Sequence, residues 1–256
     1  MQNMADSDII FGRGPVGELL RSDQPVECLY IQKGLPSGTL GKLVFLAREN
    51  AVPIKQVDAR KLDELTGREN HQGVAALVGA AHYCEVEDIF ARAGEAPPLI
   101  VLGDKIEDPR NLGAIIRTAE AVGAHGLIIP KRRSAGLSGI VSKASAGATA
   151  HLAVARVPGL PATIDQLKER GIWVYGADVS GQPYDKTDFS GPAALVLGGE
   201  GSGLSRLVKE KCDHLVSLPM FGKIGSLNVS VAAGVLLYEM VRQRSRNQDN
   251  NVKNNS

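Results

Sequence analysis

From Leu99 onward the sequence alternates between short apolar runs and helical patterns. The apolar runs are candidate strands, at Leu99–Leu102, Gly126–Ile129, Leu152–Val157, Trp173–Ala177, Ala194–Leu197 and Leu215–Leu218. Helical periodicity lies between most of them, at Asn111–Val122, Ile140–Ala148, Ile164–Arg170 and Asn228–Gln243. Continuous apolar strands separated by helices are typical of a parallel sheet that is covered on both faces. We therefore predict an α/β fold with a mostly parallel sheet and helices on both faces.

The rest of the chain divides around this pattern. Residues 1–80 alternate short strands and helices and predict a separate small α/β domain. Residues 81–98 carry one basic and four acidic residues and end in Pro97-Pro98, which cannot continue a helix. We predict a linker there, a second domain over residues 99–246, and a disordered tail over residues 247–256, which are polar and rich in Asn.

Composition excludes several classes of protein. No stretch approaches the ~18 apolar residues of a membrane span, and the N-terminus lacks the pattern of a secretory signal, so we expect a cytoplasmic protein. Cys28, Cys84 and Cys212 lie far apart without a CxxC motif, which argues against disulfides and against a metal site. Residues 99–256 carry 19 Lys and Arg against 14 Asp and Glu. This mild excess suits a phosphate backbone, but an ordinary solvated surface explains it more simply.

Three segments carry residues that could bind a ligand or catalyse a reaction. The first follows the strand at Leu99–Leu102. It reads Asp108-Pro-Arg-Asn-Leu-Gly-Ala-Ile-Ile-Arg-Thr-Ala-Glu-Ala-Val-Gly. Asn111 is a good helix N-cap, and Arg117 follows nearly two turns later among apolar residues. Such an arginine needs an ionic partner or binds an anion, unless its stem covers apolar surface and its head reaches water.

The second segment is a glycine-rich run after the strand at Ala194–Leu197, with Gly199, Gly201 and Gly203 forming a GxGxG pattern. This pattern suggests a Rossmann dinucleotide fingerprint. Only 53 residues follow Gly203, and no acidic partner lies about 20 residues further on, which weakens that interpretation. The glycines still allow positive φ and close backbone approach to a ligand, and they suit an aimed carboxylate at Glu200. The simpler alternative is a turn with an exposed glutamate.

The third segment runs from Leu218-Pro-Met to Ser226-Leu-Asn and enters the last helix. Ser226 and Asn228 are helix-capping residue types, so capping explains them as well as a functional role does. The helix that follows is apolar almost all round. Such a helix is buried in a core or in a subunit interface.

Together, in this order and each at a strand end, the three segments closely resemble motifs 1, 2 and 3 of the SpoU/TrmH family of RNA ribose 2′-O-methyltransferases, in the SPOUT superfamily. The resemblance covers about residues 99–244. The N-terminal part, with Phe11-Gly12 before a helix and His71-Gln-Gly near its end, looks like the substrate-binding domain of the RlmB-like subgroup. It departs at Gly14-Pro15, where many such proteins have a plainer helix start.

The resemblance implies a catalytic domain with a C-terminal trefoil knot, preceded by an L30e-like RNA-binding domain. It also implies a homodimer packed partly through the last helix, with S-adenosylmethionine bound in the knot. The residues it implies for the cofactor, mostly through backbone atoms, are Leu197, Gly198, Gly199, Leu218, Met220 and Leu227. The residues it implies for the reaction are Asn111, Arg117, Glu200, Ser226 and Asn228.

The implied reaction is methyl transfer to a ribose 2′-hydroxyl, which we expect in a guanosine of large-subunit (23S) ribosomal RNA. Arg117 would bind the adjacent phosphate and steady the developing oxyanion. Because arginine side chains lose their proton only above pH ~12, Glu200 is the better candidate for a general base or for a group that orients the hydroxyl. The alternatives are a tRNA substrate, a non-catalytic RNA-binding protein of the same fold, and a nucleotide-binding oxidoreductase supported only by the GxGxG run.

Overall fold

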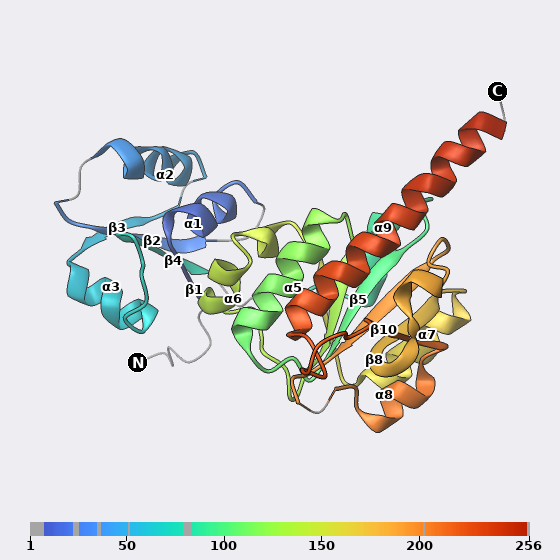
Figure 1. Cartoon of the computed structure of the whole chain (residues 1–256). Coiled ribbons are helices and arrows are strands. Elements are labelled where there is room, and N and C mark those ends of the chain that lie inside the picture. The colour runs from blue at the N-terminus through green and yellow to red at the C-terminus, as the bar shows by residue number, and fades with distance from the viewer. Residues whose placement is uncertain are drawn as a thin grey trace. The chain divides into compact units, whose positions relative to one another are not determined.

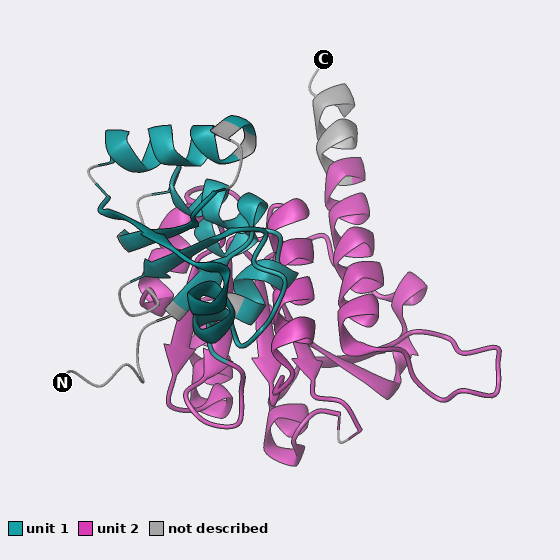
Figure 2. Ribbon diagram, turned by 90° about the vertical axis from the view of Figure 1, so that its left-hand side faces the viewer, with its two compact units in different colours: residues 1–82, 136–151 teal, residues 83–135, 152–256 magenta. Residues whose placement is uncertain are grey.

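The computed structural model describes residues 8–22, 26–34, 37–50, 52–78, 83–201 and 203–254. The chain forms two compact units (Figure 2). The N-terminal unit comprises residues 1–82 and 136–151, and the C-terminal unit comprises residues 83–135 and 152–256.

The C-terminal unit is built on a six-stranded sheet in the order β10-β8-β9-β5-β6-β7, with all neighbouring strands parallel. The strands are β5 (Leu99–Asp104), β6 (Gly126–Pro130), β7 (Val154–Val157), β8 (Trp173–Pro183), β9 (Ala193–Gly198) and β10 (His214–Ser217). Every residue of β5 is buried, because this strand has a neighbour on each side and helices above and below. The predicted α/β class with a parallel sheet is confirmed, whereas the knot stays a prediction.

Helices cover both faces of this sheet (Figure 1). One face carries α4 (Val86–Ala93), α7 (Leu160–Glu169) and α8 (Arg206–Lys211), and the other carries α5 (Pro109–Ala121) and α9 (Val229–Asn254). Successive strand residues point to opposite faces. Ile100 and Leu102 of β5 therefore join the core beneath α7, while Val101 between them points to the opposite layer.

The domain boundaries differ from those predicted. Residues 83–98, predicted as most of a linker, belong to the C-terminal unit. The backbone N–H of Glu85 donates to the Asp88 carboxylate (2.9 Å), and Ile89 of α4 is fully buried. Acidic residues in the first turn interact favourably with the positive end of the helix dipole, so this acidic run stabilises the start of a helix. Residues 81 and 82 lie outside the described residues.

A second difference concerns residues 136–151, which were predicted within the second domain. They carry α6 (Gly139–Ala144) and group with the N-terminal unit. α6 packs against the first strand of that unit, which accounts for its place there.

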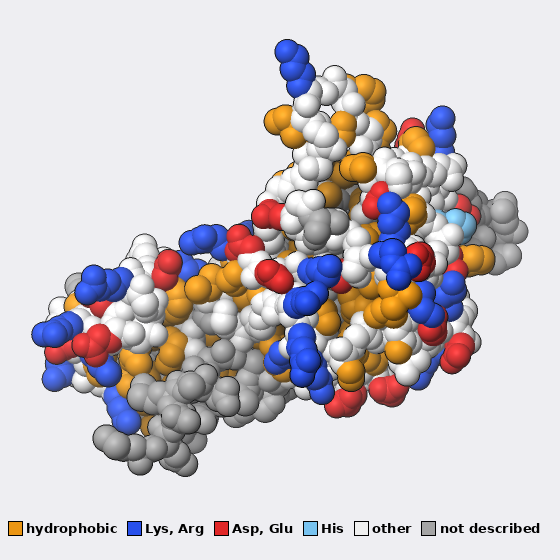
Figure 3. All heavy atoms as spheres, turned by 90° about the horizontal axis from the view of Figure 1, so that it is seen from below, with side chains coloured by type: hydrophobic (Ala, Val, Ile, Leu, Met, Phe, Trp, Pro, Cys, Tyr) orange, Lys and Arg blue, Asp and Glu red, His pale blue; other side chains and the backbone are white. Residues whose placement is uncertain are grey.

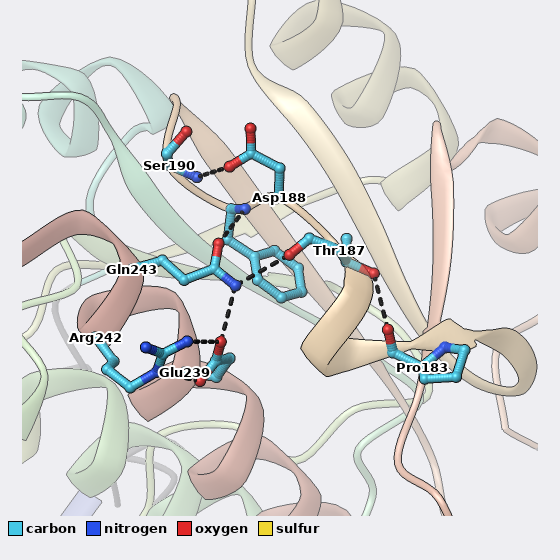
Figure 4. A network of polar contacts seen from close by, with 8 residues as sticks. Pro183, Thr187, Asp188, Ser190, Glu239, Arg242 and Gln243 are labelled. Atoms are coloured by element: carbon cyan, nitrogen blue, oxygen red, sulfur yellow. Dashed lines mark hydrogen bonds and ion pairs between the residues drawn. The ribbon is translucent and has the colours of Figure 1, made fainter. Parts of the chain in front are cut away.

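The long helix α9 is tied to the segment after β8 by a polar network (Figure 4). Gln243 accepts a hydrogen bond from the Phe189 backbone N–H (2.8 Å) and donates to the carbonyl oxygen of Thr187 (3.0 Å) and the carboxylate of Glu239 (2.8 Å). The helix continues to Asn254, so the prediction of a disordered tail is wrong for residues 247–254. Residues 255 and 256 lie outside the described residues.

The N-terminal unit has a four-stranded sheet in the order β1-β4-β2-β3, in which β2 and β3 are parallel and the other pairs antiparallel. Its elements are β1 (Asp8–Phe11), α1 (Arg13–Leu19), β2 (Val26–Gln32), α2 (Ser37–Glu49), β3 (Ile54–Val57), α3 (Ala59–Thr66) and β4 (Val74–Val78). Leu29 and Val74 of the sheet pack with Leu19 of α1 and Leu43 of α2. Within the part of the chain that the structure describes, no helix has the length and apolarity that a membrane span requires.

Candidate active site

A glycine-rich turn at the end of β9 projects Glu200. The N–H of Gly199 donates to the carbonyl oxygen of Asp104 at the end of β5 (2.8 Å), and its own carbonyl oxygen accepts from Gly203 (3.0 Å). Gly203 adopts a φ of 60°, which favours glycine, and a Cβ on Gly199 would overlap the carbonyl oxygen of Lys105. The glycines therefore let the turn close tightly against the loop that follows β5, with Glu200 exposed on it.

Three side chains from three distant segments meet at this turn. Glu200 Oε1 accepts hydrogen bonds from Nδ2 of Asn111 (2.7 Å) and Nδ2 of Asn228 (2.8 Å). Asn228 Nδ2 also donates to Asn111 Oδ1 (3.0 Å). Glu200 Oε2 has no hydrogen-bond partner among the described residues. The cluster fixes one carboxylate oxygen and leaves the other available to a ligand.

Asn111 does not cap α5 as predicted. The cap is Asp108, whose carboxylate accepts from the Arg110 backbone N–H (2.7 Å), and Pro109 begins the helix. Asn111 lies in the first turn and is only 8% exposed, so its amide is free to join the cluster. Asn228 does precede α9, and its Oδ1 accepts from the Ser230 backbone N–H (2.9 Å).

A cavity of about 430 Å³ lies between the middle of β8, the ends of β9 and β10 and the first turns of α9. All six residues predicted for the cofactor line it, namely Leu197, Gly198, Gly199, Leu218, Met220 and Leu227. Much of the remaining wall is apolar, from Val216, Val229, Ala232 and Leu236. A wall of apolar side chains and glycine backbone suits a ligand with a flat apolar group that is held by main-chain hydrogen bonds.

Asp178 at the end of the apolar part of β8 adds a carboxylate to this wall. It accepts hydrogen bonds from the backbone N–H (2.9 Å) and hydroxyl (2.7 Å) of Ser180 and pairs with Lys209 (2.9 Å). Partial burial alone would raise the pKa of Asp178, but the hydrogen bonds from Ser180 and Lys209 outweigh it and lower the pKa below the usual range. The sequence analysis missed this residue, although an acid directly after an apolar strand was a usable signal.

Asp104 is a second residue that the sequence analysis missed. Its carboxylate is 5% exposed and accepts from the Ser205 backbone N–H (2.6 Å), which ties the far end of the glycine-rich turn to β5. The signal was an acidic residue at the end of an otherwise apolar strand.

A smaller cavity of about 250 Å³ adjoins the larger one. Its polar lining comes from Lys105, Glu107, Asp108, Asn111 and Glu200. Both cavities share Glu200 and its neighbour Gly199 in their walls. The anchored carboxylate therefore lies where two ligand-sized spaces meet.

The remaining predicted residues lie apart from the cluster. Ser226 lines the larger cavity, and its side chain makes no hydrogen bond within the described ranges. Arg117 is exposed on α5, lines neither cavity, and forms no ion pair with any residue that the structure describes. Among the described residues, no group of three or more His, Cys, Asp or Glu is placed to hold a metal ion.

Two parts of the chain match known protein families. Residues 98–238 match the SpoU rRNA Methylase family, and residues 9–84 match the domain described as RNA 2′-O ribose methyltransferase substrate binding. The first match spans more than half of the 256 residues. The chain belongs to the SpoU rRNA methylase family. This confirms the predicted family and the predicted class of enzyme, an RNA methyltransferase.

Individual relatives of this SpoU-family chain agree. YacO of Bacillus subtilis (strain 168), assigned to the TrmH family of tRNA/rRNA methyltransferases, is 47% identical over 242 residues, covering 93% of this chain and 96% of YacO. The SpoU methyltransferase AviRb from Streptomyces viridochromogenes, solved with AdoMet, aligns with a TM-score of 0.80 and 30% identity over 94% of this chain and 91% of AviRb. An AdoMet-bound rRNA methyltransferase from Sinorhizobium meliloti shares the fold, with a TM-score of 0.77 and 24% identity over 93% of this chain and 87% of that one. The predicted cofactor is thus the one that the AviRb structure contains.

Proposed function

We propose that this SpoU-family protein is a cytoplasmic homodimer that transfers a methyl group from S-adenosylmethionine to the ribose 2′-hydroxyl of a guanosine in 23S ribosomal RNA. The observation that carries the proposal is Glu200, anchored by Asn111 and Asn228 where two cavities meet. Methyl transfer to a hydroxyl needs the alcohol oxygen in line with the S–CH₃ bond of the donor, and a proton acceptor within hydrogen-bond reach of that hydroxyl. The match of residues 9–84 to an RNA 2′-O ribose methyltransferase substrate-binding domain supports ribose as the acceptor.

The larger cavity fits S-adenosylmethionine. Its apolar wall, with Val216 and Leu236, would hold the adenine, and backbone groups of Leu197 and Leu218 would recognise its edge. A Cβ on Gly198 would overlap the backbone of Gly203, so the floor of the cavity is already closely packed. The bound cofactor supplies an electrophilic methyl group on a sulfonium.

The protein's own groups position the acceptor and receive its proton. The free Oε2 of Glu200 would accept the proton of the ribose 2′-hydroxyl, while Asn111 and Asn228 hold Oε1 and so fix the direction of the carboxylate. Correct placement of the nucleophile supplies much of the rate in such a transfer. A general base contributes about 10²- to 10⁴-fold more.

Arg117 would bind the phosphate next to the target ribose and stabilise charge in the transition state. Because it lies outside both cavities, we assign it to the site of the second protomer. α5, which carries Arg117, packs beside α9, and α9 exposes Val231 (51%), Val235 (39%) and Tyr238 (59%) at helical spacing. This apolar stripe is the surface through which we expect the dimer to form.

The test of the reaction is transfer of labelled methyl from S-adenosylmethionine to 23S rRNA and, in parallel, to tRNA transcripts, followed by alkaline hydrolysis. Methylation of the 2′-oxygen blocks alkaline cleavage of the next phosphate, so label is expected in dinucleotides from 23S rRNA that contain guanosine. Label in mononucleotides would show base methylation and overturn the proposal. Label only in tRNA would assign the tRNA substrate named for the relatives.

The role of Glu200 is tested in the same assay. Glu200→Gln keeps the shape and one oxygen acceptor but is no longer a base. We expect kcat to fall at least about 10²-fold, with the dissociation constant for S-adenosylmethionine within threefold of wild type. A variant with near-normal kcat would remove Glu200 from proton transfer.

Mixed dimers test whether Arg117 acts across the interface. Arg117→Ala and Glu200→Gln protomers, each inactive alone, are combined by co-expression with two different tags. If Arg117 serves the partner's site, one site of each mixed dimer contains both wild-type residues and turnover returns to about half the wild-type value per dimer. If Arg117 serves its own site, the mixed dimers stay inactive.

A further inference from the structure

Two neighbouring loops at the carboxyl edge of the C-terminal sheet are joined to each other. β5 and β6 are parallel neighbours, so the loops that follow them, residues 105–108 and 131–135, leave the sheet side by side. The backbone N–H of Ala135 donates to the carbonyl oxygen of Ile106 (2.8 Å). Lys131 is held from the other side, because its N–H donates to the carbonyl oxygen of Val157 (2.8 Å) and its carbonyl oxygen accepts from the Arg156 guanidinium (3.1 Å).

These joined loops and the first turn of α5 present cations that form no ion pair within the described part of the chain. The cations are Lys105, Arg110, Lys131, Arg132 and Arg133. The acids in the same loops are Glu107 and Asp108, and Asp108 is engaged in capping α5. Lys and Arg side chains gather on the side of the molecule where α5 and α9 begin (Figure 3).

The strip of cations begins at the reaction centre. Lys105 lines the smaller cavity together with Asn111 and Glu200. Lys131, Arg132 and Arg133 lie one strand further along the edge and are all exposed. Neighbouring strands are about 4.8 Å apart, so the strip leads away from Glu200 in the direction of β7.

We propose that the residue 131–133 loop, with Lys105, binds the phosphates of the RNA strand next to the nucleotide whose ribose reaches Glu200. This inference rests on the proposed function and adds to it a phosphate-binding ledge on the catalytic unit itself. The loop positions RNA but takes no part in proton transfer, because its side chains lie in the wall of neither cavity. Unpaired cations on a backbone that is held at both ends can contact several successive phosphates of one RNA strand and so fix its register on the protein.

The experiment uses Lys131→Gln/Arg132→Gln, which keeps side chains of similar reach and removes two charges. Its matched control is Arg170→Gln/Lys186→Gln, which removes two charges from exposed positions of the same unit outside both loops. Retention of a 23S rRNA transcript on filters gives the RNA dissociation constant at several KCl concentrations. Binding of S-adenosylmethionine and the fluorescence of Trp173 report that each variant is folded.

We expect RNA binding at low salt to weaken about five- to tenfold, and the dependence of log Kd on log salt to fall by about 1.4, at roughly 0.7 per lost contact to a single strand. Affinity for S-adenosylmethionine and kcat at saturating RNA should not change, and the control should bind RNA within twofold of wild type. The inference is overturned if the double variant and the control bind RNA equally. If the wild-type protein binds the RNA but labels none of it, the proposed function is refuted, while phosphate binding by the residue 131–133 loop can still be measured. If the double variant loses its fold, Arg132→Gln and Arg132→Lys replace it, and only Arg132→Lys should retain binding.

Discussion

Replacing Arg244 by alanine tests how α9 is attached to the segments that enter β5 and β9 of the C-terminal unit. Its guanidinium donates to the backbone carbonyl oxygens of Pro97 (3.0 Å), Pro98 (2.9 Å) and Gly191 (2.7 Å). It has no acidic partner in the described ranges. One side chain of α9 thus joins the entry to β5 and the entry to β9, two segments that are adjacent only in the folded chain.

The expected loss follows from these three contacts, which are shorter than a fourth from Nε to the carbonyl oxygen of Phe189 (3.5 Å). A carbonyl that loses a charged donor and stays away from water costs about 1–3 kcal/mol. Arg244 is half-buried, so water reaches part of the space that it leaves. We therefore expect Arg244→Ala to lower the free energy of unfolding by about 3–4 kcal/mol, which moves the urea midpoint down by about 1.5–2 M at a typical slope of roughly 2 kcal/mol/M.

The assay is urea unfolding followed by the fluorescence of Trp173, the single tryptophan of the chain, which lies on β8 of the same unit. Arg242→Ala is the matched control two residues away. Its guanidinium is exposed and pairs with Glu239 within α9 (2.6 Å, Figure 4). The Glu239 side chain is 10% exposed, but the guanidinium of Arg242 stays in water and screens the pair. We therefore expect loss of the pair to cost about 1 kcal/mol and to move the midpoint by about 0.5 M. Equal midpoints for the two variants would refute the reasoning, because water would then satisfy the three carbonyls as well as Arg244 does.

Gly198→Ala places a Cβ against the backbone of Gly203 and Leu204, so calorimetry should show loss of S-adenosylmethionine binding, and the free energy of unfolding should drop by about 1–3 kcal/mol. Gly191→Ala, with open space around it, should leave cofactor binding unchanged. Burial, aided by the charge of Arg244, lowers the pKa of His125, although its contact with Leu99 opposes this. The folded protein therefore resists protonation of His125, and as the pH falls below about 6.5 the free energy of unfolding drops by up to about 1.4 kcal/mol per pH unit. Urea titrations at pH 7.5 and 5.5 should show a smaller drop in His125→Asn. If the proposed homodimer forms through the exposed stripe of α9, Val235→Glu should give a monomer in light scattering, whereas Ser245→Glu on the same helix should leave the mass of the wild-type protein unchanged.

The sequence predicted the central strands well because their burial is complete. The predicted strands at residues 99–102, 126–129 and 194–197 differ from β5, β6 and β9 by two residues at most. β8 was predicted to end at Ala177 but continues to Pro183. Its polar second half pairs with β10 after a shift in register, and such tertiary pairing leaves no mark in the local pattern of apolar residues.

Two short helices escaped prediction for different reasons. α4 lay in a segment whose acidic residues and terminal prolines indicated a linker, although the same acids stabilise the start of a helix. α8 has only six residues and buries Val208 alone, which is too short a pattern for helical periodicity to stand out.

The cluster at Glu200 joins residues that lie 89 and 117 positions apart in sequence from Asn111. Strand ends of a parallel sheet share one edge, so the sequence alone placed the three segments on the same side of the sheet. It did not give the strand order, and only the pairing of β9 beside β5 brings Glu200 to Asn111. The family resemblance supplied what periodicity lacked.

For the two asparagines, helix capping and membership of the Glu200 cluster are not competing explanations. Asp108 and Pro109 start α5, which releases the Asn111 side chain from a role that its residue type would otherwise fill. Asn228 does both tasks at once, because Oδ1 accepts from the start of α9 while Nδ2 donates to Glu200. The helix start therefore fixes the orientation of the amide that orients the carboxylate. Asn228→Asp would keep the capping acceptor and replace the donor by a negative charge facing Glu200, so it should preserve the helix and impair turnover, which separates the two roles in a single substitution.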